Sequence, residues 1–325
     1  MNKSYIFLLV FLLLIIACED NPVENENDED NNTPITLQKE IIDAGVRSVF
    51  TVAFGNNGLI AWGGLEFEIK VRGKFTLKDH IGAIYSIDFN ENGNLLASGS
   101  SDHNIKIWDV ATGKLLKTFS QHLTTARDVK FTIDGKSIIS AENNHIVYWR
   151  NVVVGNTGKV LFLGHNNRIN SIDIDRSNQT VISGSMDSTI KVWNANTGDE
   201  LTSLNAHKGI VNGVEFSPVK NQFASCGSDS TIIIWDANSN KPTKSLKEHN
   251  GEPKTISYHP SGNYLASGNS DSKIYIYDLN NNTIIKILEG HTSVITTIDF
   301  NSDGNRIVSG AADDIVILWK NVFSD

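Results

Sequence analysis

Short apolar stretches separated by turn residues recur along most of the chain. After His80, for example, apolar stretches occupy Ile84–Phe89, Leu95–Gly99, Ile105–Trp108 and Leu115–Phe119, and Asn-Gly, Ser-Asp and Thr-Gly dipeptides separate them. Alternation with a period of two residues, interrupted by such dipeptides, is typical of strands joined by tight turns. The pattern therefore predicts units of four short strands, and no long segment has the period of a helix.

The units repeat in register with a spacing of 42 or 43 residues. Histidines occur at positions 80, 122, 165, 207, 249 and 291, and a serine follows each of them after 18 residues. In five units an aspartate lies 22 residues after the histidine, and an aromatic residue lies six residues later. The five full sets are His80, Ser98, Asp102 and Trp108; His165, Ser183, Asp187 and Trp193; His207, Ser225, Asp229 and Trp235; His249, Ser267, Asp271 and Tyr277; and His291, Ser309, Asp313 and Trp319.

A repeat of about 42 residues with these marks resembles the WD40 family of β-propellers. The resemblance is carried by Gly164-His165, Gly290-His291, Trp108-Asp109 and Trp235-Asp236, and it covers residues 80–320. It implies an all-β, seven-bladed WD40-type propeller in which each blade has four strands. Because one blade cannot bury both of its faces, the blades must stack around an axis.

The seventh blade and the closure of the ring come from the residues before His80. Residues 43–79 show the same strand pattern without the histidine, aspartate or final tryptophan, so we predict a degenerate first blade there, ahead of six clear repeats at 80–325. After Trp319 the chain has too few residues for a fourth strand. Residues 33–42 fit a fourth strand, and we expect them to complete the last blade, as is usual in the family.

Serine, histidine and aspartate in fixed register also occur in hydrolases, and this alternative has to be weighed. A catalytic triad needs an exposed nucleophile and is needed once, whereas here the set recurs in five units. Four sets end in an indole N–H, which only donates. The resemblance implies buried structural tetrads, and we expect no catalytic residue and no cofactor. Two units depart from the pattern: the unit of His122 has Asn144 where the others have the aspartate, and the unit of His249 ends in Tyr277.

The first 32 residues have a different composition. Residues 1–17 have the apolar length of a signal peptide and end before Cys18 in Ile-Ile-Ala, which resembles a bacterial lipobox. The resemblance implies lipid attachment to Cys18, and the alternative is an ordinary signal peptide cut near Ala17. Residues 18–32 contain seven acids and no base, which indicates a solvated tether. We expect a bacterial cell-envelope protein held by its lipid in the outer membrane, facing either side.

Composition restricts the possible partners. The chain of 325 residues has a net charge of −9, but most of the excess negative charge lies in the tether, and the remaining residues are nearly neutral. A strongly basic face is absent, which argues against nucleic acid as the partner. With two cysteines the chain has neither a disulfide framework nor a four-cysteine zinc site, and we expect no metal. Cys226 is predicted to be a small core residue.

The position five residues after each histidine resembles the family's position at the central opening of the narrower propeller face, where partners commonly dock. Its mixture of aromatic and basic side chains is typical of binding hot spots. We predict a monomeric, non-enzymatic scaffold that binds a protein or peptide on this face, with membrane contact only through Cys18. The alternative is a propeller enzyme or glycan-binding protein acting on extracellular polymers. The candidate binding residues at this position are Tyr85, Arg127, Asn170, Asn212, Lys254 and Thr296, with Phe50 from the first blade; Arg168, Met186 and Glu252 are added from nearby loop positions at the same end.

Overall fold

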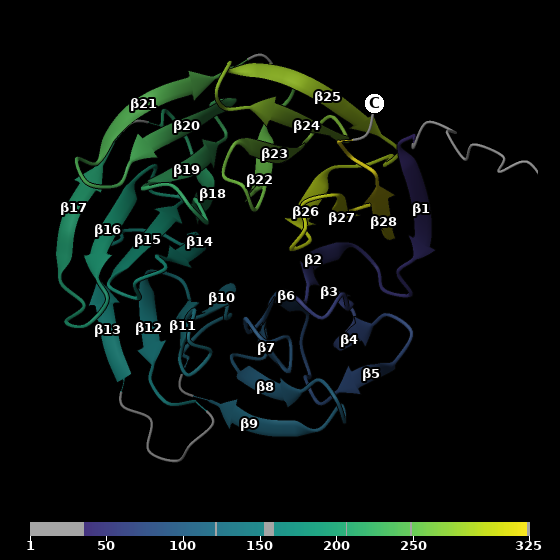
Figure 1. Ribbon diagram of the computed structural model, residues 1–325. Helices are drawn as coiled ribbons and strands as arrows, with labels where there is room; N and C mark the ends of the chain where they lie inside the picture. Colours follow the sequence, from purple (N-terminus) through teal and green to yellow (C-terminus); the bar gives the residue numbers. More distant parts are fainter. Residues whose placement is uncertain (1–35, 121, 153–158, 206, 248, 324–325) are drawn as a thin grey trace, which may run out of the picture. The chain divides into compact units, whose positions relative to one another are not determined.

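The computed structural model describes residues 36–120, 122–152, 159–205, 207–247 and 249–323. These residues form 28 strands in seven four-stranded antiparallel sheets, and they contain no helix. Figure 1 shows the sheets arranged around a central opening, with one edge strand of each sheet innermost. The all-β, seven-bladed propeller is therefore confirmed. The predicted signal peptide, the predicted tether and Cys18 lie outside the described residues.

The first four blades follow the chain in order, and within each blade every strand pairs with the next. Blade 1 corresponds to the degenerate unit. Its strands are β2 (Val49–Phe54), β3 (Ile60–Gly64), β4 (Glu68–Val71) and β5 (Phe75–Lys78); blade 2 has β6 (Ile84–Phe89), β7 (Leu95–Ser100), β8 (Ile105–Asp109) and β9 (Leu115–Phe119); blade 3 has β10 (Asp128–Phe131), β11 (Ile138–Ala141), β12 (His145–Trp149) and β13 (Lys159–Leu163); blade 4 has β14 (Ile169–Ile174), β15 (Thr180–Ser185), β16 (Ile190–Asn194) and β17 (Glu200–Leu204).

The last three blades continue the same pattern, except that blade 7 takes its outer strand from the start of the chain. Blade 5 has β18 (Val211–Phe216), β19 (Gln222–Gly227), β20 (Thr231–Asp236) and β21 (Lys241–Leu246); blade 6 has β22 (Pro253–Tyr258), β23 (Tyr264–Asn269), β24 (Lys273–Asp278) and β25 (Thr283–Glu289); blade 7 has β26 (Ile295–Phe300), β27 (Arg306–Ala311), β28 (Ile315–Lys320) and β1 (Gln38–Asp43).

The strand β1 closes the ring. It pairs antiparallel with β28, from Gln38 opposite Lys320 to Asp43 opposite Ile315, and Figure 1 shows it on the outer rim beside the end of the chain. The expected closure by the N-terminal segment is therefore confirmed. The strand lies a few residues later than the expected 33–42, of which residues 33–35 are not described.

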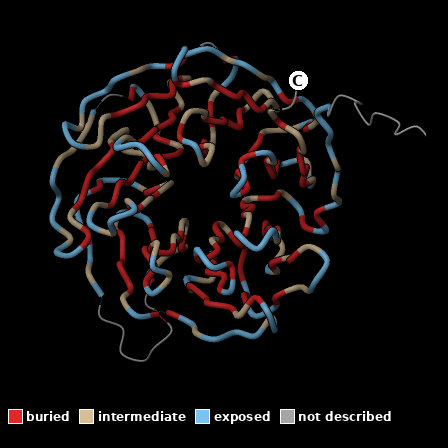
Figure 2. Tube along the Cα trace, in the orientation of Figure 1, coloured by how far each residue is buried: buried red, intermediate tan, exposed pale blue. Residues whose placement is uncertain are grey.

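The hydrophobic core is divided among the interfaces between blades. Seven clusters of buried side chains each join two neighbouring blades, and the cluster between blades 2 and 3, for instance, contains Ile107, Phe119 and Trp149. Figure 2 shows the buried residues in the inner and middle strands and the exposed ones on the outer strands and loops. Because each blade buries its two faces against its neighbours, stability depends on the whole ring.

Candidate functional site

Four blades contain the hydrogen-bonded set that the repeat register indicated. In blade 2 the Trp108 indole N–H donates to Ser98 Oγ at 2.9 Å, and His80 lies 2.8 Å from the same oxygen through Nε2 and 2.7 Å from Asp102 through Nδ1. The same contacts occur in the sets of His165, His207 and His291, with distances of 2.7–3.1 Å. Each set links the loop before the inner strand to the second and third strands of its blade.

These side chains are closed to a substrate. Ser98 and its three counterparts are 0% exposed, and each serine oxygen already accepts an indole N–H. Burial lowers the pKa of His165 and His291, so the neutral ring with its proton on Nδ1 is the form that fits between serine and aspartate. Burial opposes ionisation of Asp187, but hydrogen bonds from Thr189, Asn166 and His165 outweigh it and lower its pKa to about 2. The sets hold loops in place.

The unit of His122 differs from the expectation in its acid. Glu142, rather than Asn144, occupies the place of the carboxylate: its Oε2 lies 3.2 Å from His122 Nδ1 and accepts the Thr124 backbone N–H at 3.0 Å. The turn is one residue shorter here, and the longer glutamate side chain reaches the histidine from an earlier position. Its other oxygen contacts His145. Ser140 still bonds His122 and Trp149 as in the other blades.

The set of His249, Ser267, Asp271 and Tyr277 does not form as expected. The Tyr277 hydroxyl reaches past the serine and lies 2.7 Å from His249 Nδ1, the atom that the aspartate contacts elsewhere. Asp271 instead accepts the Tyr275 hydroxyl at 2.7 Å. Within the described residues, Ser267 Oγ and His249 Nε2 are buried without a hydrogen-bond partner. The Tyr277 hydroxyl thus bonds the histidine instead of the serine, and the Tyr275 hydroxyl, rather than the histidine, bonds the aspartate.

Blade 1 fastens its loops by other means. The Trp62 indole N–H donates to the Ala44 carbonyl at 2.7 Å, and Arg47 Nε lies 2.8 Å from Glu66 Oε1. Glu66 lies in the turn between β3 and β4, which corresponds to the aspartate turn of other blades. Arg47 and Glu66 therefore link the same two loops as histidine and aspartate do elsewhere.

The candidate binding residues at the opening are placed by β-bulges. In six of the seven inner strands the pairing shifts by one residue near the start, and the extra residues are Phe50, Tyr85, Asn170, Asn212, Lys254 and Thr296. A bulge turns a side chain away from the regular alternation, and all six residues line the central cavity. Arg127, which also lines it, lies one residue before β10.

Several of these side chains are committed to neighbouring blades. Asn170 Nδ2 donates to the Val211 carbonyl at 2.9 Å, Asn212 Nδ2 donates to the Pro253 carbonyl at 2.9 Å, and the Thr296 hydroxyl bonds the carbonyl of Val49. On blade 6, Lys254 and Glu252 form an ion pair with each other. Met186 lies beside Arg168 in a shallow cleft. The predicted binding residues therefore differ in how many of their polar groups are already bonded within the protein. The aromatic and guanidinium groups of blades 1–4 have the fewest such bonds.

Exposed apolar residues that the repeat pattern did not indicate lie at the same end of the ring as the candidate binding residues. Ile81 and Leu123, each directly after a repeat histidine, are 79% and 80% exposed, and Leu65 and Phe67 in the β3–β4 turn are also exposed. We call the end of the ring that carries the histidine loops and aspartate turns the histidine-loop face. The sequence could have indicated Ile81 and Leu123, because they are apolar at a loop position where other units have asparagine, lysine or threonine.

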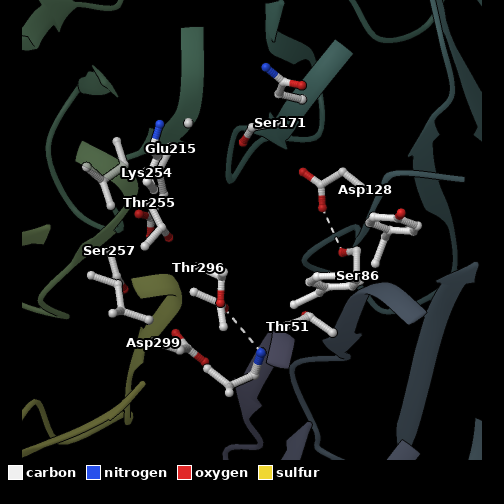
Figure 3. A pocket seen from close by; sticks show the side chains of 18 of the residues that line it. Thr51, Ser86, Asp128, Ser171, Glu215, Lys254, Thr255, Ser257, Thr296 and Asp299 are labelled. Atoms are coloured by element: carbon white, nitrogen blue, oxygen red, sulfur yellow. Dashed lines mark hydrogen bonds between the residues drawn. The ribbon is translucent and has the colours of Figure 1, made fainter. Parts of the chain in front are cut away.

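The central cavity, about 210 Å³ in volume, contains acids that the sequence reasoning also missed. Figure 3 shows Asp128, Glu215 and Asp299 around it. Four acids lie eight residues after a histidine, where blade 3 has Lys130, and each accepts a backbone N–H from the next blade. Three of the four, Asp88, Glu215 and Asp299, line the cavity. The bonds run from Phe131 to Asp88, Phe216 to Asp173, Tyr258 to Glu215 and Phe54 to Asp299, at 2.7–3.1 Å.

Burial of these acids changes their titration. Burial raises the pKa of Asp88 to about 7 and that of Glu215 to about 8, although Lys130 opposes both shifts. Burial likewise raises the pKa of Asp173 and Asp299 to about 6. The four acids link neighbouring blades, and Asp88 and Glu215 are only partly ionised near neutral pH.

Other polar groups show no metal-binding arrangement in the described ranges, where no group of three or more His, Cys, Asp or Glu side chains is placed to hold an ion. In the same residues, no helix is long and apolar enough to cross a membrane. Cys226 in β19 is fully buried, and burial raises the pKa of its thiol to about 12.

Comparison with known families identifies the repeats. The model of the WD domain, G-beta repeat, matches residues 73–109, 157–194, 198–236, 240–278 and 282–320, which is more than half of the chain. The chain therefore belongs to the WD40 repeat family. The matched ranges leave out most of blade 1 and most of blade 3, whose loop contacts differ from the common set, but they include blade 6, whose network also differs.

Individual relatives are similar over one part of the chain. A WD repeat domain-containing protein 83 homolog of Dictyostelium discoideum is 27% identical over 40% of this chain and 39% of its own length. Autophagy-related protein 16 of Arabidopsis thaliana is 32% identical over 37% of this chain and 23% of its own. Set1 complex component swd2 of Schizosaccharomyces pombe is 28% identical over 41% and 38%. The chain thus spans well under half of the length of these relatives.

Proposed function

We propose that this protein is a non-enzymatic, monomeric interaction scaffold that binds a partner protein or peptide through its histidine-loop face. The observation that carries the proposal is the sector of blades 1–4, where Phe50, Tyr85 and Arg127 line the opening and apolar Ile81 and Leu123 project into solvent. Aromatic, arginine and exposed apolar groups at one end of a rigid ring have the make-up of an interface centre. Membership of a family with relatives named as complex components agrees with it.

Affinity capture with the full chain tests this proposal. A variant with Tyr85, Arg127 and Lys254 changed to alanine should lose the bound protein, because these side chains occupy one end of the channel. The matched control is Arg176→Ala, which alters an exposed arginine in the turn at the other end of β14. Identical captured proteins with all baits would contradict the proposed face.

A glycan-binding role is the second candidate, and one feature favours it. Asn143, Asn144, Asn166 and Asn167 line a cleft with Arg168 and Met186, and amides and arginine suit sugar hydroxyls. Retention of polysaccharide without enrichment of any protein in the same capture would favour this role over the scaffold.

We also propose that a lipid on Cys18 anchors the protein in the bacterial envelope, in the outer membrane, with residues 18–32 as the tether. The short apolar stretch ending in Ile-Ile-Ala-Cys supports this. Two or more acyl chains would hold the protein more firmly than one.

Metabolic labelling with a lipid precursor tests the anchor. The unaltered chain should incorporate label and fractionate with membranes, and Cys18→Ala should do neither, because the acceptor thiol is gone. Label that persists in the Cys18→Ala variant would disprove attachment at this residue.

A further inference from the structure

One sector of the histidine-loop face contains a stack of side chains from three successive blades. The rings of Phe50 and Tyr85 are parallel within 8° at a centroid distance of 5.0 Å, and the Arg127 guanidinium lies 4.4 Å from the centre of the Tyr85 ring. A cation over an aromatic face is attracted to it, and the planar guanidinium becomes oriented. Arg127 is therefore held at the channel opening before any partner arrives.

Arg127 and Arg168 have no carboxylate within ion-pair distance among the described residues. The Nε atom of Arg127 is buried and has no hydrogen-bond partner there. Arg168 uses only its Nε in a side-chain bond, to Asn170 Oδ1 at 3.1 Å. Two partly buried guanidiniums without a counter-charge are unusual, because burial of a charge is costly unless it is paired.

The positive charges of the two arginines repel each other electrostatically. Burial, followed by the positive charge of Arg127, lowers the pKa of Arg168. Arg168 bonds Asn170, which lines the same cavity as Arg127. The two like charges repel, and an anion bound by both would remove the repulsion and supply the missing acceptors. A carboxylate fits this requirement because guanidinium groups bind its two oxygens with parallel N–H bonds.

We propose that Arg127 and Arg168 together bind an aspartate or glutamate side chain of the partner polypeptide. This inference rests on the proposed scaffold function and adds the chemistry of the recognised residue. A polypeptide fits better than a small anion, because exposed Leu123 lies on the same loop as Arg127 and exposed Ile81 lies on the corresponding loop of blade 2, where both can contact apolar residues beside the acid. The asparagines in the cleft next to Arg168 can pair with the partner's backbone.

Fluorescence anisotropy with a defined probe tests the inference on the full chain. The probe is a short labelled peptide of glutamate, leucine and glycine, and its neutral counterpart has glutamine in place of glutamate. Arg127→Gln and Arg168→Gln should each weaken binding of the acidic peptide about tenfold, the loss of one charge-assisted contact. Arg176→Gln, in the turn at the opposite end of β14, should leave it unchanged.

The neutral peptide completes a double-mutant cycle. It should bind more weakly than the acidic peptide, and neither arginine variant should weaken it further. Equal affinity for both peptides, or no binding of either, overturns the carboxylate inference, whereas the scaffold function is judged separately by the capture experiment. Displacement of the peptide by an equal concentration of inorganic phosphate would indicate a small-anion site instead. Thermal unfolding of each variant shows that the change is not one of folding.

Discussion

At the scale of single residues, the buried serine determines whether a blade's loops are fastened by a complete network. In blade 4 Ser183 accepts the Trp193 indole N–H at 2.9 Å and lies 2.7 Å from His165. In blade 6 the equivalent Ser267 has no such partner in the described residues, because Tyr277 bonds the histidine directly. Serines at the same position of the repeat therefore differ in their contribution to stability: Ser183 bonds two side chains, whereas Ser267 bonds none in the described residues.

Ser183→Ala is expected to destabilise the protein by about 1–3 kcal/mol, since it leaves a buried indole N–H and imidazole nitrogen unpaired. Ser267→Ala is the matched control and should change stability by less than about 0.5 kcal/mol. Urea unfolding of both variants, followed by circular dichroism, measures the difference. Equal losses in the two blades would contradict the network described here.

Register within the repeat was sufficient to indicate which side chains meet in four blades, because each blade has the same strand geometry. It did not indicate which side chain contacts the histidine in the blades of His122 and His249. There the contact depends on how far a glutamate or a tyrosine hydroxyl reaches across the blade, which is a property of packed side chains.

At the scale of strands, the outer strand of blade 7 comes from the opposite end of the chain. Six residues of β1 pair with β28, and Glu40 adds ion pairs to Lys320 and Arg72. These ion pairs are partly exposed and contribute little. The backbone ladder is the main connection, and without it β28 becomes an open edge.

Deletion of residues 36–43 should lower the melting temperature sharply and promote association of chains through the open edge of β28. Calorimetry and light scattering measure the two effects. A deletion of the same length within residues 19–32 is the control, because that segment is expected to be a tether. An unchanged melting curve for the 36–43 deletion would show that β1 does not hold the ring closed.

Short strands and turns could be predicted, since they depend on local alternation and turn residues. The closing segment could be predicted because the last unit lacks residues for a fourth strand and the resemblance implies closure by the start of the chain. The bulges at the start of the inner strands could not. The extra residue at Tyr85, for example, is defined only by the pairing of Ile84 with Ser100 and of Ser86 with Gly99. These bulges decide which side chains line the opening.

At the scale of the whole ring, acids in the channel connect blades and make stability depend on pH. The raised pKa values of Asp88, Asp173, Glu215 and Asp299 mean that the folded state holds their protons more tightly than the unfolded chain does. Their contribution is full below about pH 4 and is lost as the pH rises through about 6–8. The lowered pKa of Asp187 acts oppositely, and its contribution is lost as the pH falls from about 4 toward 2.

The channel acids ionise as the pH is raised from about 5 to 8 and should make the melting temperature fall over that window, whereas the lowered pKa values of the buried His165 and His291 oppose this fall below about pH 6.5. Asp88→Asn should reduce this fall, since the amide can still accept the Phe131 N–H but does not titrate. Asp199→Asn, in an exposed turn, is the control. Differential scanning calorimetry at several pH values is the measurement, and an identical pH dependence in all three proteins would contradict the role of the channel.

Local repetition along the sequence determined the fold class, the number of blades and the side chains that meet within most of them, because strands, turns and tetrads form from residues close together in one unit. Tertiary structure decided which residues at the channel opening remain available. Thr296 is committed to Val49, 247 residues away, whereas Arg127 stacks on Tyr85 without an acid partner in the described part of the chain. Contacts between blades depend on closure of the ring, and no single repeat contains that information.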